Sequence, residues 1–402
     1  MFAAANRYKL SMLDTKASQS RQLQIPSVEV NTMTSARPRS LNRGTSKSPS
    51  RQPLYQGLSS EDKCHISLEY AFSHNIQLKT RYSVHNVVGF GTNGCVLAAR
   101  DLSRPETFSA VAIKIIYKPR AGKLNQISSE VQALKTFADM GSKSFILQYL
   151  DEWQDSCHFY LVTELYGSDW MSFAAPEERP AGTNYRPITV HGTTYTVHSG
   201  TSDLWAWSYV HRLHLFKTEG HTLLAFQPIQ SVIKQVATAL ALIHSRSFYH
   251  GDVKIENIII QSTVRPGAKV VEGADVRLAD FGHTKYVYDG IKAYGTRAVS
   301  PPELLPDSPF DRKELDGRAA DVFALGMCLF SLLNKDCRLP DRVMQSHYAD
   351  LLQADNGRFP FEGIPDLGED GWSLLHGMCS VDPSHRLKIQ QVLVHPWLSA
   401  EM

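Results

Sequence analysis

The sequence lacks the features that mark several classes of protein. Its six cysteines are scattered and include no C-x-x-C pair, which in a chain of 402 residues indicates reduced thiols in an intracellular protein rather than a disulfide framework. The longest apolar run, FALGMCLFSLL at 323–333, is far too short to span a bilayer. No internal repeat is visible. We therefore expect neither a disulfide-stapled secreted domain, nor a membrane helix, nor a repeat array.

Acidic residues are scarce at the start of the chain. Residues 1–60 contain nine Lys and Arg against two acids, a net charge of +7, while the whole chain carries +2, so residues 61–402 carry −5. This start is rich in Ser, Arg and Pro and has no apolar periodicity, so it cannot bury enough surface to offset the entropy of ordering. We therefore expect residues 1–65 to form a disordered basic tail.

Three roles for this tail stay open. A composition poor in acids and rich in Arg and Ser suits a solvated extension, an organelle transit peptide, or an arm for nucleic acid or nuclear import. We expect an intracellular protein in the cytoplasm, the nucleus or both, with mitochondrial import through the tail as the alternative.

From about residue 80 the pattern changes to short β-branched runs and then to helical spacing. Strands are expected at 81–88, 94–100, 110–116, 146–153 and 159–165. A helix at 126–137 would place Ile127, Val131 and Leu134 on one face. Further helices are expected at 228–244, 318–334, 369–379 and 387–398. The sequence therefore predicts an α+β fold in which a small β-rich lobe with one helix precedes a larger helical lobe.

The stretch VVGFGTNGCV at 87–96 contains the pattern G-x-G-x-x-G-x-V. Glycines let a backbone approach phosphates closely and adopt torsion angles that other residues avoid. In a dinucleotide-binding fold the third glycine would open a helix, whereas here Val96 begins another strand. The pattern therefore indicates a β-hairpin lid over phosphates, although by itself any glycine hairpin would match it.

Lys114 ends the apolar strand sequence VAIK, twenty residues after Gly94. A buried ammonium is costly unless it is paired, and Glu130 on the following helix is the plausible partner. A lysine held in this way can present its charge to the α- and β-phosphates of a nucleotide. The alternative is a surface lysine at a strand end, and the preceding glycine loop argues against it.

Five motifs occur in the order and approximate spacing of the eukaryotic protein kinases: GFGTNGCV, VAIK, HGDVKIEN at 250–257, DFG at 280–282 and SPPE at 300–303. The chain resembles this family over residues 80–398, with residues 80–164 as N-lobe and 167–398 as C-lobe. GTRAVSPPE and ELYGSDWMSF are also similar to the Pim and PAS-domain kinases of the calmodulin-kinase-like group. The resemblance implies the bilobal kinase fold and a Ser/Thr kinase that uses ATP and Mg²⁺.

The resemblance assigns separate roles within one phosphoryl transfer. Asp252 would accept the proton of a substrate hydroxyl, and Lys254 would stabilise the γ-phosphate, as in Ser/Thr kinases. Asn257 and Asp280 would supply the hard oxygen ligands that Mg²⁺ prefers. Outside this context an H-x-D triplet is usually an ordinary turn and DFG a common tripeptide.

The resemblance also implies an ATP pocket. Thr163 would lie at the back of the adenine site, residues 164–166 would form the hinge, and Asp169 would contact the ribose. The residues expected to bind ATP are Val88, Gly89, Phe90, Gly91, Thr92, Asn93, Gly94, Val96, Ala112, Lys114, Thr163, Glu164, Tyr166 and Asp169.

Other positions have structural roles in the family. Thr296 would hydrogen-bond the catalytic loop, and Asp321 would brace that loop from a central helix. Glu303 would pair with Arg386. We therefore regard these residues as supports of the site, with Glu303 and Arg386 outside it.

Gly251 stands where the family usually has arginine. That arginine takes no part in the chemistry and binds a phosphate on the activation loop, which glycine cannot do. The segment between Gly282 and Ser300 is also short. We therefore expect activity that does not depend on activation-loop phosphorylation.

Two insertions depart from the family pattern, at 175–225 and 262–275. The first contains YRPITVHGTTYTVHSG, which alternates like a strand pair. It also contains histidines whose spacing matches no standard set of metal ligands: His191, His198, His211, His214 and His221. We interpret it as a locally packed flap, with a partner-docking surface as the alternative.

The sequence thus predicts a protein serine/threonine kinase that acts as a monomer on protein substrates, with no nucleic acid bound by its kinase domain and no membrane association. A pseudokinase that scaffolds partners through the tail and the insertion is the first alternative. The filled positions Lys114, Asp252, Asn257 and Asp280 argue against it. A small-molecule kinase of the same fold is the second, against which GTRAVSPPE favours protein substrates.

Overall fold

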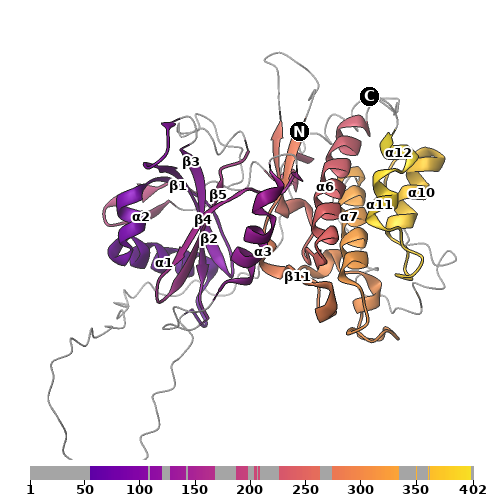
Figure 1. The fold of residues 1–402 in the computed structure, drawn as a ribbon, viewed down its shortest axis with the longest axis horizontal. Coiled ribbons are helices and arrows are strands. Elements are labelled where there is room, and N and C mark those ends of the chain that lie inside the picture. The colour runs from indigo at the N-terminus through magenta and orange to yellow at the C-terminus, as the bar shows by residue number, and fades with distance from the viewer. Residues whose placement is uncertain are drawn as a thin grey trace, which may run out of the picture. The chain divides into compact units, whose positions relative to one another are not determined.

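Strands gather in the first part of the folded chain and helices in the second, as the indigo-to-yellow colouring of Figure 1 shows. This order confirms the predicted β-rich lobe followed by a helical lobe. The computed structural model describes residues 55–106, 109–119, 127–141, 144–167, 187–197, 203–205, 207–208, 226–262, 274–334, 350, 361 and 363–399. All of them belong to one unit, Arg51–Met402.

The N-terminal lobe is built on a five-stranded antiparallel sheet in the order β1-β2-β3-β5-β4. Its strands are β1 (Tyr82–Phe90), β2 (Gly94–Asp101), β3 (Ala110–Tyr117), β4 (Tyr149–Gln154) and β5 (His158–Glu164). Helix α3 (Ser129–Phe137) buries Val131 and Leu134 as predicted. Ile127, however, lies before the helix begins and is 71% exposed, so its predicted place on the buried face was wrong.

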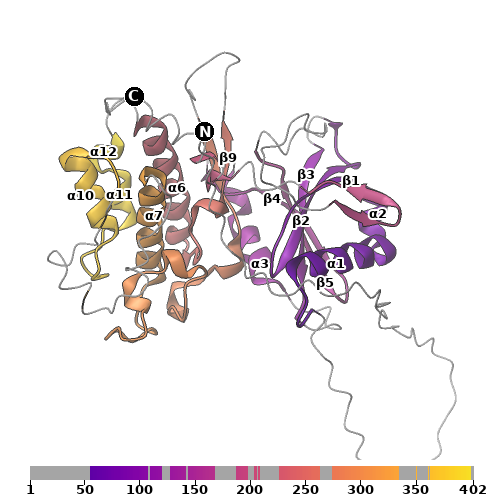
Figure 2. The same cartoon turned by 180° about the vertical axis from the view of Figure 1, so that it is seen from behind.

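The sheet has two apolar faces. Lys114 defines the inner face, while its β3 neighbours Val111, Ile113 and Ile115 alternate with it and are buried in a separate core on the outer face. That core is closed by helices α1 (Ser60–His74) and α2 (Ile76–Arg81) and by the hairpin of β6 (Ile188–Val190) and β7 (Thr193–Tyr195). Figure 2 shows α1 and α2 beside the strands of this lobe. The outer face of the sheet is therefore covered by one segment that precedes the glycine-rich stretch and by another that lies between VAIK and HGDVKIEN in the sequence.

Helix α1 begins earlier than the expected tail allows. The Ser59 hydroxyl oxygen caps it by accepting the Asp62 N–H at 3.1 Å. Before it, the ring of Tyr55 packs 4.7 Å from the ring of Tyr117, and the Tyr55 hydroxyl bonds to His158. Residues 55–65 therefore belong to the folded unit, which corrects the predicted boundary at 65, while residues 1–54 lie outside the described residues.

The insertion packs against both lobes. Its predicted strand pair is confirmed as β6 and β7, and Thr196 accepts the N–H of Val87 in β1 at 3.0 Å. Farther along, the backbone of Asp203 forms an isolated antiparallel β-bridge with Ile259 of the C-terminal lobe. The side chains of Leu204 and Trp207 are buried in the core of that lobe. The described part of 175–225 is thus a packed element of the fold.

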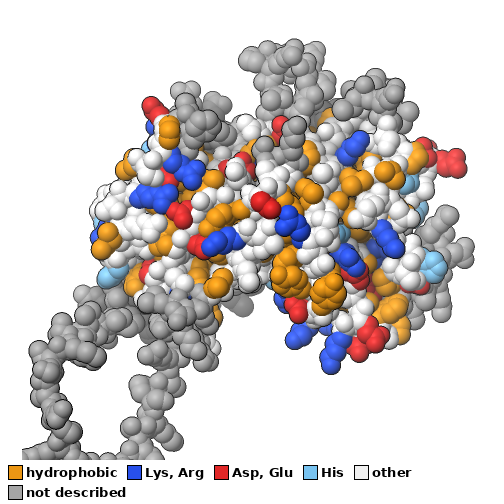
Figure 3. Space-filling view, viewed as in Figure 1, with side chains coloured by type: hydrophobic (Ala, Val, Ile, Leu, Met, Phe, Trp, Pro, Cys, Tyr) orange, Lys and Arg blue, Asp and Glu red, His pale blue; other side chains and the backbone are white. Residues whose placement is uncertain are grey.

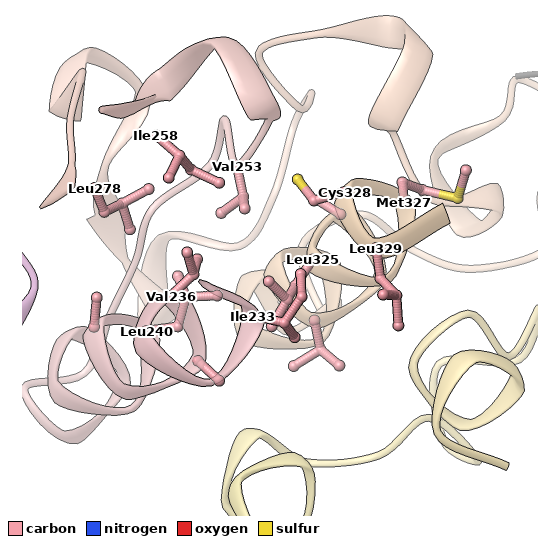
Figure 4. Packing of buried hydrophobic residues seen from close by; sticks show 14 of the residues in the cluster. Ile233, Val236, Leu240, Val253, Ile258, Leu278, Leu325, Met327, Cys328 and Leu329 are labelled. Carbon is pink, nitrogen blue, oxygen red and sulfur yellow. The ribbon is translucent and has the colours of Figure 1, made fainter. Parts of the chain in front are cut away.

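The C-terminal lobe is built around two buried helices, α6 (Gln227–Ser245) and α7 (Gly317–Leu333), close to their predicted bounds. In Figure 4 the side chains of Ile233, Val236 and Leu240 from α6 lie toward Leu325 of α7 and toward Ile258 and Leu278. The remaining elements are β8 (Phe248–Tyr249), β9 (Ile258–Ser262), β10 (Ala274–Leu278), β11 (Lys285–Tyr286), α10 (Gly368–Met378), α11 (Ile389–Leu393) and α12 (Pro396–Ser399).

The helix predicted at 387–398 is instead two short helices, α11 and α12. The break falls just before Pro396, because proline lacks the N–H of a helical hydrogen bond and disfavours helical torsions in the residue that precedes it. Pro396 then opens α12, a position where its missing N–H costs nothing.

The surface charges are mixed (Figure 3) and the described cysteines are free, as the nearly balanced charge and the scattered cysteines of the sequence predict. On the face drawn in Figure 3, Lys and Arg side chains of the described residues are interspersed with Asp and Glu. The described cysteines are Cys64, Cys95, Cys157, Cys328 and Cys379, and all five are buried free thiols. Within the described ranges, no helix is long and apolar enough to cross a membrane.

Candidate active site

Lys114 joins the two lobes electrostatically. Its Nζ donates to Glu130 Oε1 of α3 at 2.6 Å and to Asp280 Oδ1 at 2.9 Å. Burial alone would lower the pKa of Lys114, but these two carboxylates together hold that pKa above its ordinary value. The predicted pairing of Lys114 with Glu130 is confirmed, and the ammonium stays charged at neutral pH.

Asp280 adopts a strained backbone conformation that aims its carboxylate at Lys114. It follows β10 and has φ +60° and ψ +73°, the left-handed region, which non-glycine residues rarely occupy. Lys114, as the nearest cation, keeps the pKa of Asp280 well below its usual range, against the opposing effect of burial. Such strain concentrates at functional sites, because the surroundings must enforce it.

The catalytic-loop candidates converge on one carboxylate. Asp252 is buried, and its Oδ2 accepts from Asn257 Nδ2 at 3.0 Å and from Lys254 Nζ at 3.0 Å. Its Oδ1 accepts the Thr296 hydroxyl at 2.6 Å, and Lys254 Nζ also donates to Thr296 Oγ1 at 2.8 Å. The predicted bond from Thr296 to the catalytic loop is therefore confirmed.

Beneath this loop a second buried carboxylate, Asp321 of α7, holds the backbone. It accepts the N–H groups of His250 at 2.7 Å and Gly251 at 2.9 Å, the hydroxyl of Tyr294 at 2.9 Å, and a bond from His244 Nε2 at 3.0 Å. Despite burial, these donors lower the pKa of Asp321. The predicted bracing by Asp321 is confirmed.

His250 is neutral in this arrangement. Its Nε2 lies 3.1 Å from the carbonyl oxygen of Ala279, while its Nδ1 accepts the Asp252 N–H at 3.3 Å, which assigns the ring proton to Nε2. Burial lowers the pKa of His250. The ring therefore links the backbones of the HGD and DFG segments without adding charge.

Asn257 and Asp280 have the donor chemistry for a magnesium ion. The Asn257 amide nitrogen is engaged with Asp252 Oδ2 and with the Asp252 carbonyl oxygen at 2.9 Å, which leaves the amide oxygen as its free coordinating atom. Asp280 has one carboxylate oxygen on Lys114 and a second available. Two hard oxygen donors suit Mg²⁺, which completes its shell with phosphate oxygens and water.

The glycine-rich stretch forms the expected hairpin between β1 and β2. The Gly91 N–H bonds to the Gly94 carbonyl oxygen at 2.8 Å, and Thr92 and Asn93 at the tip are exposed. A Cβ atom at Gly89 or Gly91 would meet nothing within 4 Å, whereas one at Gly94 would lie 2.4 Å from the Ile115 carbonyl oxygen. The first two glycines leave backbone open toward a ligand, and the third permits contact with β3.

A small apolar cluster lies beside this hairpin. Val88, Ala98 and Leu165 are buried, and Val96, Ala110 and Ala112 pack against them. Thr163 is buried, with its hydroxyl donating to the Glu164 carbonyl oxygen at 3.2 Å. Three of the residues predicted to contact adenine, Val88, Val96 and Ala112, thus lie together in this apolar cluster.

The hinge side chains serve the fold. Glu164 Oε1 accepts from Arg277 Nε at 3.1 Å and from the Gln148 N–H at 3.0 Å, and the Arg277 guanidinium lies 4.4 Å from the centre of the Tyr166 ring. The backbone of this segment and the apolar side chain of Leu165 are left to contact a base. Asp169, the predicted ribose contact, lies outside the described residues.

The remaining support is the ion pair between Glu303 and Arg386. Arg386 donates to both oxygens of Glu303, at 2.7 and 2.8 Å, and both residues are buried. The bidentate geometry confirms the predicted pair. The sequence marked Tyr294 only as a hydroxyl-bearing residue of the activation loop, and its buried hydrogen bonds to Asp321 and Val253 were not predicted, because a lone tyrosine in a loop carries no pattern.

Comparison with known proteins agrees with this geometry. A family model described as "Protein kinase domain" matches residues 82–398. The chain is 24% identical over 333 residues to calcium/calmodulin-dependent protein kinase type 1 of Caenorhabditis elegans, covering 81% of this chain and 76% of that protein.

Two further relatives are also named as protein kinases. Serine/threonine-protein kinase SIK1 of Mus musculus is 25% identical over 80% of this chain and 33% of its own length. CBL-interacting protein kinase 20 of Oryza sativa subsp. japonica is 25% identical over 79% of this chain and 57% of its own. The chain therefore belongs to the protein kinase family and is an enzyme of the serine/threonine type.

Proposed function

We propose that the chain transfers the γ-phosphoryl group of Mg·ATP to serine or threonine hydroxyls of protein substrates without needing a phosphorylated activation loop. The observation that carries this proposal is the Asp252 carboxylate, which Lys254, Asn257 and Thr296 hold from two separate segments. Phosphoryl transfer depends mainly on positioning and charge neutralisation, so a preorganised carboxylate of this kind is what the reaction requires.

Each side chain then has one task. Asp252 accepts the proton of the attacking hydroxyl, and Lys254 beside it places a positive charge near the transferred group. Lys114 contacts the non-transferred phosphates. Asn257 and Asp280 would hold the metal, and Mg²⁺ bound there would neutralise charge on the phosphate oxygens.

The nucleotide has a matching surface on the inner face of the sheet. The apolar cluster around Val88, Ala112 and Leu165 suits a flat base, and the open backbone at Gly89 and Gly91 suits phosphates. The remaining ATP contacts predicted from the resemblance, Asp169 included, are part of the same proposal.

Independence of phosphorylation rests on the activation loop itself. Between Gly282 and Gly295 only Thr284, Tyr286, Tyr288 and Tyr294 bear hydroxyl groups. Thr284 and Tyr294 are buried, whereas Tyr286 is 46% and Tyr288 83% exposed. Gly251 has no side chain with which to bind a phosphate on either tyrosine, and the Asp252 carboxylate and its bracing residue Asp321 make their hydrogen bonds without one.

Phosphoryl transfer is tested by incubating the purified chain with labelled Mg·ATP and a generic protein substrate, followed by identification of the labelled amino acid. Asp252→Asn and Lys114→Met are the matched controls. We expect label on serine and threonine and a loss of about 10²- to 10⁴-fold in Asp252→Asn. Label no higher than in these controls, with nucleotide binding retained, would instead favour a scaffold.

Independence of phosphorylation is tested on the same protein after phosphatase treatment, beside the double variant Tyr286→Phe, Tyr288→Phe. Both samples should keep kcat within about twofold of the untreated chain, because ordinary surface changes alter energies little. Inactivity of the treated chain, with an unchanged melting temperature, would refute this part of the proposal.

A further inference from the structure

Gly251 has no side chain that could hold the activation segment, by which we mean residues 282–300. Its backbone has φ +81°, and a Cβ atom there would lie 2.6 Å from the His283 carbonyl oxygen. The position is therefore shaped for glycine, and the segment needs another anchor. Backbone bonds supply part of one: Gly295 N–H donates to the Gly251 carbonyl oxygen at 2.8 Å, and β11 pairs with β8.

The hydroxyl of Tyr294 supplies a contact of a different kind. It donates to Asp321 Oδ1 at 2.9 Å and accepts the Val253 N–H at 3.0 Å. Val253 follows Asp252 directly, so this bond fixes the peptide plane beside the catalytic carboxylate. A single buried phenol thus connects the activation segment, the catalytic loop and helix α7.

The same tyrosine also places Thr296. Tyr294 lies two residues before Thr296, whose hydroxyl donates to Asp252 Oδ1 at 2.6 Å. Loss of the Tyr294 hydroxyl would leave the Val253 N–H and one lone pair of Asp321 unsatisfied in a buried site, where such groups are costly. The strain would be transmitted to Asp252 both through Val253 and through Thr296.

We propose that Tyr294 is a positioning residue that takes the place of an arginine–phosphate clamp by tying the activation segment to the catalytic loop. This inference rests on the proposed phosphorylation-independent kinase activity. Burial and the neighbouring Asp321 raise the pKa of Tyr294 well above its ordinary value, so the phenol keeps the proton that it donates.

The test compares Tyr294→Phe with Tyr249→Phe. Tyr249 is also buried, and its hydroxyl donates to the Gly290 carbonyl oxygen at 3.0 Å, so it anchors the activation segment but makes no bond to the catalytic loop. Each variant loses one hydroxyl and keeps its ring. The measurements are kcat, KM for ATP and for a protein substrate, and melting temperature, all on phosphatase-treated full-length protein.

We expect Tyr294→Phe to lower kcat about tenfold, the effect of one misplaced catalytic hydrogen bond, with KM for ATP within about twofold. Tyr249→Phe should lower the melting temperature to a similar degree and keep kcat within about twofold. Equal kcat losses in both variants, or no loss in Tyr294→Phe, would overturn the inference.

Failure of the inference and failure of the proposed function give different results. A parent chain that is inactive after phosphatase treatment refutes the proposed function. A treated parent that is active beside an equally active Tyr294→Phe variant refutes only the role of Tyr294.

Discussion

The glycine-rich loop and the catalytic loop are both expected to face phosphates, yet they are held in different ways. In the catalytic loop, the Asp252 carboxylate accepts hydrogen bonds from Asn257 and Thr296, and the backbone N–H groups of His250 and Val253 donate to Asp321 and to the Tyr294 hydroxyl. In the glycine-rich loop, the bonds are made by the backbone: the Gly91 N–H donates to the Gly94 carbonyl oxygen, and the Asn93 carbonyl oxygen accepts the Tyr117 N–H at 2.9 Å, while Gly89 and Gly91 border open space.

This difference separates two tasks of the site. Proton acceptance requires a carboxylate in one place before substrate arrives, so the protein itself provides the bonds. A phosphate cradle requires backbone that a ligand can approach, so glycines leave the space unfilled. We therefore expect changes in the catalytic loop to affect stability and kcat together, and changes in the open part of the glycine loop to affect nucleotide binding.

The largest effect should come from placing the family's usual arginine at Gly251. Gly251→Arg combines a left-handed backbone conformation with contact against the His283 carbonyl, and we expect a loss of about 2–4 kcal/mol of unfolding free energy and a fall in kcat. Denaturant unfolding and steady-state kinetics measure both.

The matched control is Gly57→Arg. Gly57 also has a positive φ, but a Cβ atom there meets nothing within 4 Å. The Gly57→Arg variant should lose less unfolding free energy than Gly251→Arg and should keep the kcat of the parent chain. If Gly251→Arg were as stable as the parent, the catalytic loop would be less constrained than its contacts indicate.

Smaller effects on stability should distinguish two glycines within the glycine-rich loop. Gly94→Ala places a Cβ atom 2.4 Å from the Ile115 carbonyl oxygen and should destabilise the protein by about 1–3 kcal/mol. Gly91→Ala meets open space, so its unfolding free energy should change by no more than about 0.5 kcal/mol while KM for ATP rises. Equal stability losses in the two variants would contradict the division.

The smallest effect concerns pH. The pKa of His250 is lowered by burial, so the folded state favours the neutral ring, and this contribution is complete above pH 6.5, the ordinary value, and is lost as the pH falls below it. One such proton changes the unfolding free energy by at most about 1.4 kcal/mol per pH unit. Unfolding measured between pH 7.5 and 5 should show this slope.

His250→Gln should reduce that slope without removing it, because burial also lowers the pKa of His85 and His395. The carboxylates Asp280 and Asp321, whose pKa values are lowered, lose their contribution only below about pH 4, since that is the usual range of an aspartate. A slope unchanged by His250→Gln would show that His250 is protonated as readily in the fold as in the unfolded chain.

Much of the fold was predictable because the local patterns were strong. The apolar periodicity of 228–244 predicted α6 to within a residue at each end, and the β-branched runs predicted all five strands of the N-terminal sheet. The pairing of Glu303 with Arg386 and the bracing by Asp321 followed from the motifs. The predictions for Ile127 and for the end of the tail were wrong because both lie at element boundaries. Helix α3 begins after Ile127, and Ser59 caps α1 within the expected tail.

Other features depend on contacts between distant segments. Apart from Lys114, the run VAIKII is apolar, and nothing local shows that α1 and the β6–β7 hairpin would cover Val111, Ile113 and Ile115. The sequence also could not show where the insertion 175–225 packs, because its contacts with β1 and with the core of the C-terminal lobe join residues far apart in the chain.

The order and chemistry of the motifs determined by themselves that this chain is a protein kinase, because Lys114, Asp252, Asn257 and Asp280 retain the charges and oxygen donors that phosphoryl transfer needs. Only the tertiary structure decided how those groups are held. The sequence marked Gly251 as a departure from the family's arginine, but it showed neither the left-handed backbone of Gly251 nor the two hydrogen bonds of Tyr294. Charge and donor type belong to a residue, whereas burial and partners belong to the fold.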